Sequence, residues 1–216
     1  MAVALGNTSA DELEKLGTYG VSKVLHVNDS KLNNFTSKAY TKAIATLADH
    51  LHADDIVFAN NSTGRTLAPR VAVKLKASLL AGVSALPEKD GTFIKTVYSG
   101  KAFTFIKPLS VKRVISLNPN SVKPVIKQSA IIVESVNIEF LDTDFDYKVV
   151  SVKSESDGHI PLPEADLVVS AGRGMKGPEN WGIIEELAQA MGATTACSRP
   201  VADIGWRPHH EHVGQT

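Results

Sequence analysis

The feature that most constrains the fold is a glycine-rich turn between a strand-like segment and a helix-like segment. Residues 166–170 form a candidate buried strand, residues 172–177 the turn Gly-Arg-Gly-Met-Lys-Gly, and residues 178–192 a candidate helix. This order lets a backbone approach a pyrophosphate, because glycines carry no side chain and a helix start offers free N–H groups. We therefore interpret the turn as a nucleotide-type cofactor site rather than a plain strand–helix connection.

Residues 193–200 are predicted to form a second strand that ends in a polar turn, beside the glycine-rich turn. A typical NAD site carries Asp or Glu at the end of this strand, whereas this chain carries Ser198 and Arg199. Two alternatives follow: NADP, with Arg199 on its 2′-phosphate, or a flavin that is placed differently. Arg173, between two glycines of the turn, is a candidate for a charge-assisted contact to a phosphate or an electron-rich ring.

Three other polar features have simpler explanations. The His-His-Glu-His run at residues 209–212 lacks a convincing metal geometry, so we expect a polar loop near the cofactor and no metal site. Cys197 has no partner histidine at a known spacing and is expected in the core. Residues 62–65 could bind an anion, but an ordinary helix entry is favoured. With no Ser/His/Asp order, paired carboxylates or Walker loop, no catalytic residue is predicted, which fits a protein whose cofactor carries the chemistry.

The rest of the chain begins as alternating strands and helices and then becomes rich in strands. The predicted elements are strands at residues 1–6, 21–27 and 55–59, helices at residues 9–16, 36–51 and after the polar loop 60–64, a hairpin of strands 92–98 and 101–107, and further strands at 111–117 and 130–140. Alternation on short loops predicts a parallel sheet covered on both faces. Pro69 is placed in the first turn of the third helix, where proline is tolerated. The apolar face of the last helix is expected to pack on its sheet through Trp181, Ile184, Leu187 and Met191.

A polar stretch at residues 142–163 predicts a junction between two domains, which we place at residues 1–155 and 156–216. The charges balance, with 23 Lys plus Arg against 23 Asp plus Glu, which argues against a nonspecific nucleic-acid partner. No apolar run approaches the roughly 20 residues that cross a bilayer, so membrane insertion is not expected. The single cysteine, Cys197, indicates a reducing compartment.

Taken together, residues 168–177, 197–206 and 213–216 resemble the alpha subunit of electron transfer flavoprotein, and residues 60–75 and 96–101 resemble that family's N-terminal domain. The resemblance covers essentially the whole chain. It implies an α/β fold: an N-terminal parallel-sheet, nucleotide-hydrolase-like domain with a β-rich extension, followed by a partial Rossmann-like FAD-binding domain. It also implies a heterodimer with a beta subunit, one FAD, and no substrate turnover of its own.

The same resemblance implies the electron route and the site. Electrons would arrive from flavin dehydrogenases, such as those of fatty acid β-oxidation, and leave towards a quinone oxidoreductase or another acceptor. Residue by residue, the match gives FAD contacts to Arg173, Ser198, Arg199, Val213, Gly214, Gln215 and Thr216. Arg199 would pack over the flavin ring, where a fixed guanidinium stabilises negative charge on reduction and raises the potential.

Relative to the family, the chain lacks a strand–helix unit before Met1 and stops at Thr216, within the FAD domain. We therefore expect these residues to bind FAD weakly on their own. The compartment we expect is the bacterial cytoplasm, ahead of the mitochondrial matrix. Two alternatives remain open from the sequence: an NADP-dependent oxidoreductase, and a structural partner that binds the beta subunit without a cofactor.

Overall fold

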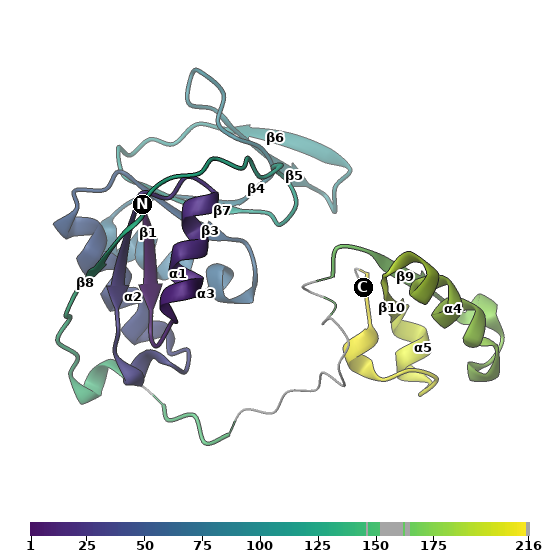
Figure 1. The fold of residues 1–216 in the computed structure, drawn as a ribbon. Coiled ribbons are helices and arrows are strands. Elements are labelled where there is room, and N and C mark those ends of the chain that lie inside the picture. The colour runs from purple at the N-terminus through teal and green to yellow at the C-terminus, as the bar shows by residue number, and fades with distance from the viewer. Residues whose placement is uncertain (146, 152–161, 163–164, 215–216) are drawn as a thin grey trace. The chain divides into compact units, whose positions relative to one another are not determined.

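The computed structural model describes residues 1–145, 147–151, 162 and 165–214 (Figure 1). The chain divides into two compact units, Met1–Val150 and Ser151–Thr216. Both units contain parallel strands with helices between them, so the α/β class expected from the sequence is confirmed. No helix among the described residues is both long and apolar enough to span a bilayer.

The N-terminal unit holds two sheets. The first has the order β1–β2–β8 and is parallel throughout. The second has the order β3–β7–β4–β5–β6, in which β3, β7 and β4 are parallel and β5 runs antiparallel to both β4 and β6 (Figure 1). The strands are β1 (Ala2–Leu5), β2 (Lys23–Val27), β3 (Asp55–Ala59), β4 (Ser78–Val83), β5 (Phe93–Val97), β6 (Ala102–Ile106), β7 (Arg113–Leu117) and β8 (Ile132–Ser135). The hairpin predicted around Ser99 and Gly100 is confirmed as β5–β6.

Three α-helices accompany these strands: α1 (Ala10–Lys15), α2 (Ser37–His50) and α3 (Ser62–Leu75). The helix predicted at residues 9–16 begins with a capping box, since Ser9 and Glu12 cap α1 reciprocally. Helix α2 packs in two core clusters. Its Ala43 and Leu47 belong to the cluster that contains Leu25 of β2, and its Ala45 and Ala48 belong to the cluster that contains residues of α3 and β7. One helix therefore contributes to the cores beside both sheets.

Pro69 was wrongly placed in the first turn of α3. The helix begins at Ser62, because the Asn61 side chain accepts a hydrogen bond from the Gly64 N–H at 2.8 Å and caps it. Pro69 therefore lies inside the helix, where its ring removes the N–H that would donate to the carbonyl of Arg65. Pro69 is exposed, so water can reach that carbonyl from the outer side of the helix.

Asn61→Ala should lower the free energy of unfolding of the N-terminal unit by about 1 kcal/mol, the usual cost of losing an N-cap side chain. Urea unfolding followed by far-UV circular dichroism measures this change. Asn61→Ser keeps a capping oxygen and serves as the matched control, with most of the stability retained. Equal losses in the two variants would show that the cap is not the cause.

Strand β4 was missed, and two predicted strands lie in a different place. The apolar run Ser78–Val83 follows α3 directly, after Lys76 turns the chain in a left-handed conformation. Strand β7 lies between β3 and β4 and is parallel to both, and β8 is parallel to β2. The antiparallel extension is therefore the β5–β6 hairpin, while residues 111–117 and 130–140 return to the parallel sheets.

Only part of the parallel sheet is covered on both faces. Strand β2 is buried along most of its length, whereas Val57 of β3 and Leu79 of β4 are 62% and 40% exposed. Ile56 and Phe58 of β3 pack towards α3, and side chains alternate along a strand, so Val57 points to the opposite face. The prediction that the parallel sheet is covered on both faces was therefore wrong for β3 and β4.

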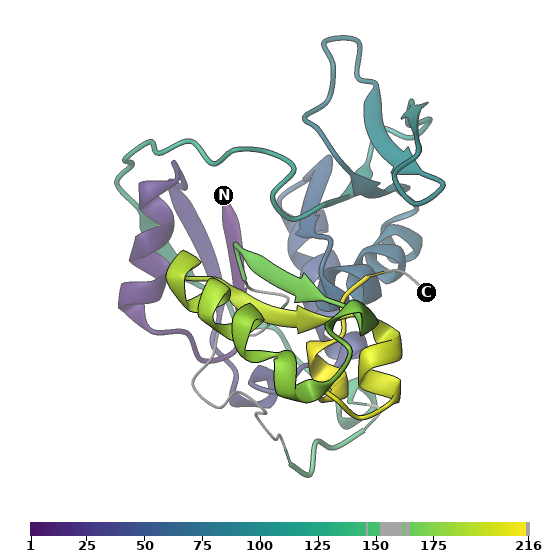
Figure 2. The same cartoon turned by 90° about the vertical axis from the view of Figure 1, so that its right-hand side faces the viewer.

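The C-terminal unit is a smaller strand–helix–strand unit. It contains β9 (Val168–Ala171), α4 (Gly182–Met191), β10 (Thr194–Cys197) and α5 (Arg199–Asp203). Helix α4 lies along the two parallel strands (Figure 2). Trp181 and Ile184 pack into the core with Cys197, but Leu187 and Met191 are about half exposed, so the predicted helix face was only half right. The buried side of α4 continues through Ala188 rather than through these two residues.

Candidate functional site

The parallel pairing of β9 and β10 brings three chain segments together at their carboxyl ends. Ala171 lies opposite Cys197, so Gly172 and Ser198 are the next residues of each strand, and the Ser198 N–H donates to the Ala171 carbonyl at 3.0 Å. A further parallel bridge joins Cys197 to His212, and the Val213 N–H donates to the Cys197 carbonyl at 2.9 Å. Open parallel sheets bind ligands at this end of their strands. We call the position of Gly172, Ser198 and Val213 the carboxyl edge.

Gly172 leaves the space beside the Ser198 hydroxyl free of a side chain. A Cβ at this position would lie 3.4 Å from the Ser198 hydroxyl oxygen, at the lower limit of ordinary van der Waals contact. The turn then continues through a 3-10 turn at Arg173–Met175, and Asn180 closes it by donating to the Met175 carbonyl at 2.8 Å. Helix α4 begins at Gly182, later than the predicted residue 178, because a second 3-10 turn at Pro178–Asn180 comes first.

Two guanidinium groups lie in the segments that leave this edge. Arg173 follows Gly172 and is exposed. Arg199 begins α5 with Pro200 as the second residue, a position that suits proline, and its side chain is 56% exposed. Its Nε lies 3.5 Å from the Asp203 carboxylate, and an exposed pair of this kind contributes little stability.

The remaining predicted site residues are the four at positions 213–216, and the structure describes the first two of them. Val213 is partly buried at the carboxyl edge, and Gly214 follows it with a φ of 101°, which favours glycine. Gln215 and Thr216 lie outside the described residues. The structure thus brings Gly172, Ser198 and Val213 together.

The described residues fit the pyrophosphate and ring of a dinucleotide such as FAD. The open glycine turn admits a phosphate, the Ser198 hydroxyl can donate to it, and the exposed guanidiniums of Arg173 and Arg199 can neutralise negative charge. These are the donor types that hold a phosphorylated, electron-rich group.

The other candidates of the sequence have structural roles. Cys197 is fully buried, and burial, followed by the charge of Glu211, raises the pKa of its thiol, so its core assignment is confirmed. Residues 62–65 form an ordinary helix entry capped by Asn61, as favoured. Across the part of the chain that the structure describes, no group of three or more His, Cys, Asp or Glu side chains could hold a metal ion.

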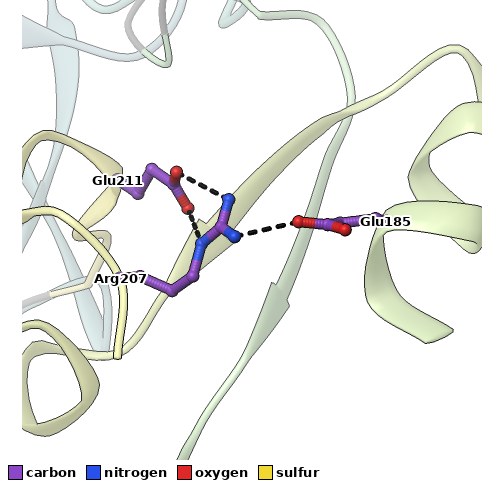
Figure 3. A network of polar contacts seen from close by, with 3 residues as sticks. All are labelled: Glu185, Arg207 and Glu211. Atoms are coloured by element: carbon purple, nitrogen blue, oxygen red, sulfur yellow. Dashed lines mark hydrogen bonds and ion pairs between the residues drawn. The ribbon is translucent and has the colours of Figure 1, made fainter. Parts of the chain in front are cut away.

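One polar network was not expected from the sequence. Arg207 donates from Nε and Nη2 to the two carboxylate oxygens of Glu211, at 2.7 and 2.8 Å, and from Nη1 to Glu185 at 2.9 Å (Figure 3). Hydrogen bonds with Glu211 are the main reason that the pKa of Arg207 is raised. We call Glu185, Arg207 and Glu211 the Arg207 network. The i, i+4 spacing of Arg207 and Glu211 was a visible signal, but the distant Glu185 was not.

Comparison with known proteins covers both units. A family model described as electron transfer flavoprotein domain matches residues 1–142, and one described as electron transfer flavoprotein FAD-binding domain matches residues 161–216. The second match contains the carboxyl edge.

Three relatives illustrate the similarity. The chain is 31% identical to an electron transfer flavoprotein subunit alpha of Thermoanaerobacterium thermosaccharolyticum, with 100% of this chain and 67% of the relative covered. The subunit alpha of Paracoccus denitrificans is 32% identical, over 100% of this chain and 68% of its own length. The subunit LctC of a lactate dehydrogenase (NAD(+),ferredoxin) of Acetobacterium woodii is 28% identical, over 99% of this chain and 52% of its own length.

Proposed function

The chain belongs to the electron transfer flavoprotein alpha family, and on this premise we propose that it holds FAD together with a beta subunit and carries electrons between flavin dehydrogenases and an acceptor. The cofactor of the matched domain is FAD, and alpha subunits of this family are electron-transfer proteins without substrate turnover of their own. The observation that supports the proposal most directly is that the FAD-binding match spans the carboxyl edge.

We assign the FAD contacts to the residues expected from the sequence. Arg173 and Ser198 would bind the cofactor from the ends of β9 and β10, and Arg199 would lie over the ring. The segment of residues 213–216 would complete the site on the flavin side. FAD, when bound, supplies the redox chemistry by accepting and releasing electrons at its ring. The chain supplies orientation and fixed positive charge.

The electron donor and acceptor belong to the proposal as well. We propose acyl-CoA dehydrogenases of fatty acid β-oxidation as donors and a quinone oxidoreductase as acceptor, in the reducing bacterial cytoplasm that the single cysteine suggests. A relative that is named as a subunit of a lactate dehydrogenase offers a different donor for comparison. The domain limits 1–155 and 156–216, with a Rossmann-like second domain, remain part of this proposal.

The first experiment is an absorbance spectrum of this chain co-purified with a beta subunit from the same source. We expect visible flavin absorbance that bleaches when an acyl-CoA dehydrogenase and its substrate are added. A colourless complex would contradict FAD binding by the heterodimer. Bleaching by lactate dehydrogenase components but not by the acyl-CoA system would contradict the proposed donor while keeping the electron-carrier function. NADPH oxidation with a discrete organic substrate would instead favour the oxidoreductase alternative.

Arg199→Met should lower the reduction potential of the bound flavin, because the guanidinium stabilises negative charge that appears on reduction. The expected shift is about 60 mV, equivalent to about 1.4 kcal/mol for one electron. Redox titration of the FAD-saturated heterodimer measures it. Arg199→Lys keeps the charge and should shift the potential less. An unchanged potential in Arg199→Met would remove Arg199 from the flavin ring.

A further inference from the structure

The segment between α5 and the carboxyl edge has few backbone contacts with the sheet. After α5 ends at Asp203, the chain passes through a 3-10 turn at His209–Glu211 before it reaches Val213. Among the described backbone hydrogen bonds, the one from the Val213 N–H to the Cys197 carbonyl joins the end of this segment to β10. The third member of the carboxyl edge therefore needs support from side chains.

Arg207 provides that support from within the segment. Its side chain is 23% exposed and that of Glu211 is 14% exposed, so the bidentate pair between them lies largely out of water. The third donor, Nη1, reaches the more exposed Glu185 of α4, and the guanidinium carbon lies 5.8 Å from the centre of the Trp181 ring. One side chain thus connects the segment to helix α4 (Figure 3). Through Trp181 it also reaches the core of the unit.

We propose that Arg207 is a positioning residue that holds His212 and Val213 beside β10 and thereby keeps the carboxyl edge in register. Glu211 immediately precedes His212, so any movement of Glu211 is passed directly to the bridge with Cys197. The effect of Arg207 on cofactor binding rests on the proposed function. Its effect on the position of Val213 does not, because that position is a property of this chain alone.

Charge explains why Arg207 can fix the segment. Glu185 and Glu211 are held on opposite sides of one guanidinium, whose planar fork offers two parallel donors to Glu211. Without the guanidinium the largely buried Glu211 carboxylate would lose its bidentate partner, and residues 207–212 could regain solvation for it by moving towards water. A lysine keeps the charge but cannot make the same three directed hydrogen bonds.

Hydrogen exchange of the Val213 amide tests the positioning role without any cofactor. In the full chain, Arg207→Met should accelerate exchange of this amide at least tenfold, and Arg207→Lys should recover only part of the protection. The matched control is Arg113→Met, which removes a bidentate pair with Asp55 (2.5 and 2.6 Å) from the N-terminal unit. Unchanged Val213 exchange in Arg207→Met, or equal acceleration in both variants, would overturn the proposal.

A milder variant covers the case in which Arg207→Met does not fold. Glu185→Gln leaves the pair between Arg207 and Glu211 intact and weakens only the contact with α4. It should accelerate Val213 exchange by about twofold to fivefold, the range expected for one exposed ion pair. An exchange rate equal to that of the unmodified chain would contradict a role for α4 in holding the segment.

A second experiment measures FAD binding by the heterodimer of this chain with the beta subunit. Arg207→Met should raise the dissociation constant for FAD at least tenfold, while Arg113→Met should leave it within twofold. Equal affinity in Arg207→Met would refute the role of Arg207 in the cofactor site. If the unmodified heterodimer bound no FAD, the proposed function would fail, and the exchange of Val213 would still decide the positioning role.

Discussion

Trp181→Ala is expected to lower the free energy of unfolding of the C-terminal unit by about 3–5 kcal/mol, the usual range for removing a large aromatic side chain from a core. Trp181 is 2% exposed and packs with Cys197, Val201 and Ala202, the other buried members of its cluster. The substitution also removes the ring beneath Arg207. Because this unit is small, a loss of that size is comparable with the whole stability that a domain of its length can have.

Fluorescence offers a direct measurement of this loss. The chain has two tryptophans, Trp181 and Trp206, and both lie in the C-terminal unit, so Trp206 still reports its unfolding in the variant. Ile183→Ala is the matched control, since Ile183 is 65% exposed on the same helix and should change stability by less than about 0.5 kcal/mol. Equal destabilisation by both substitutions would show that Trp181 is not the centre of this core.

Trp181→Phe keeps an aromatic ring at the same position and removes only the indole N–H and part of the packing. The indole N–H of Trp181 is buried and has no hydrogen-bond partner among the described groups. A buried donor without a partner costs stability, so phenylalanine loses packing but also removes that cost. We therefore expect Trp181→Phe to be clearly less destabilising than Trp181→Ala. The reverse order would show that a phenylalanine ring cannot fill the space that the indole occupies.

Local signals in the sequence were sufficient for most helices and strands. Ser9 and Glu12 predicted the start of α1, and the apolar stripe of residues 36–51 predicted α2 nearly to the residue. These signals depend on neighbours in the chain, which are visible in one sequence. The position of Pro69 was wrong for the same kind of reason, because Asn61 can end a loop or cap a helix, and only the hydrogen bond to Gly64 distinguishes the two.

Pairing between distant strands was not visible in the sequence. Strand β7 follows the β5–β6 hairpin along the chain, yet it lies between β3 and β4. A parallel neighbour must be reached by a crossover, so adjacency in sequence does not predict adjacency in the sheet. The exposed Leu187 and Met191 show a related limit, since an apolar stripe predicts a face but not how much of that face is covered.

The sequence predicted those parts of the candidate site that lie in short continuous motifs. Gly172 and Ser198 directly follow two neighbouring parallel strands, as the sequence indicated, because both come after strand-like runs at the same end of a strand–helix–strand unit. The Arg207 network was not predictable, since Glu185 and Arg207 meet only when α4 and the segment after α5 pack together. Whether the assigned residues contact FAD remains a prediction for the experiments proposed above.

Gly64→Ala is expected to destabilise the N-terminal unit by about 3 kcal/mol or more, at or above the upper end of the usual cost of overpacking. A Cβ on Gly64 would lie 1.8 Å from the carbonyl oxygen of Ala59, far inside any allowed contact. The obstacle is backbone at the end of β3, so no side-chain rotation can relieve it. Either α3 must move away from β3 or its first turn, capped by Asn61, must unwind.

The matched control for Gly64→Ala is Gly182→Ala. Gly182 also lies in the first turn of a helix, but a Cβ there would meet no atom within 4 Å. Alanine stabilises helical positions by roughly 0.5–1 kcal/mol relative to glycine, so Gly182→Ala should raise the stability of the C-terminal unit. Urea unfolding of each unit, by circular dichroism for Gly64→Ala and tryptophan fluorescence for Gly182→Ala, measures both changes. A stable Gly64→Ala variant would mean that the approach of α3 to the Ala59 carbonyl is looser in solution, and that the close packing of helix on strand is not what requires glycine at this position.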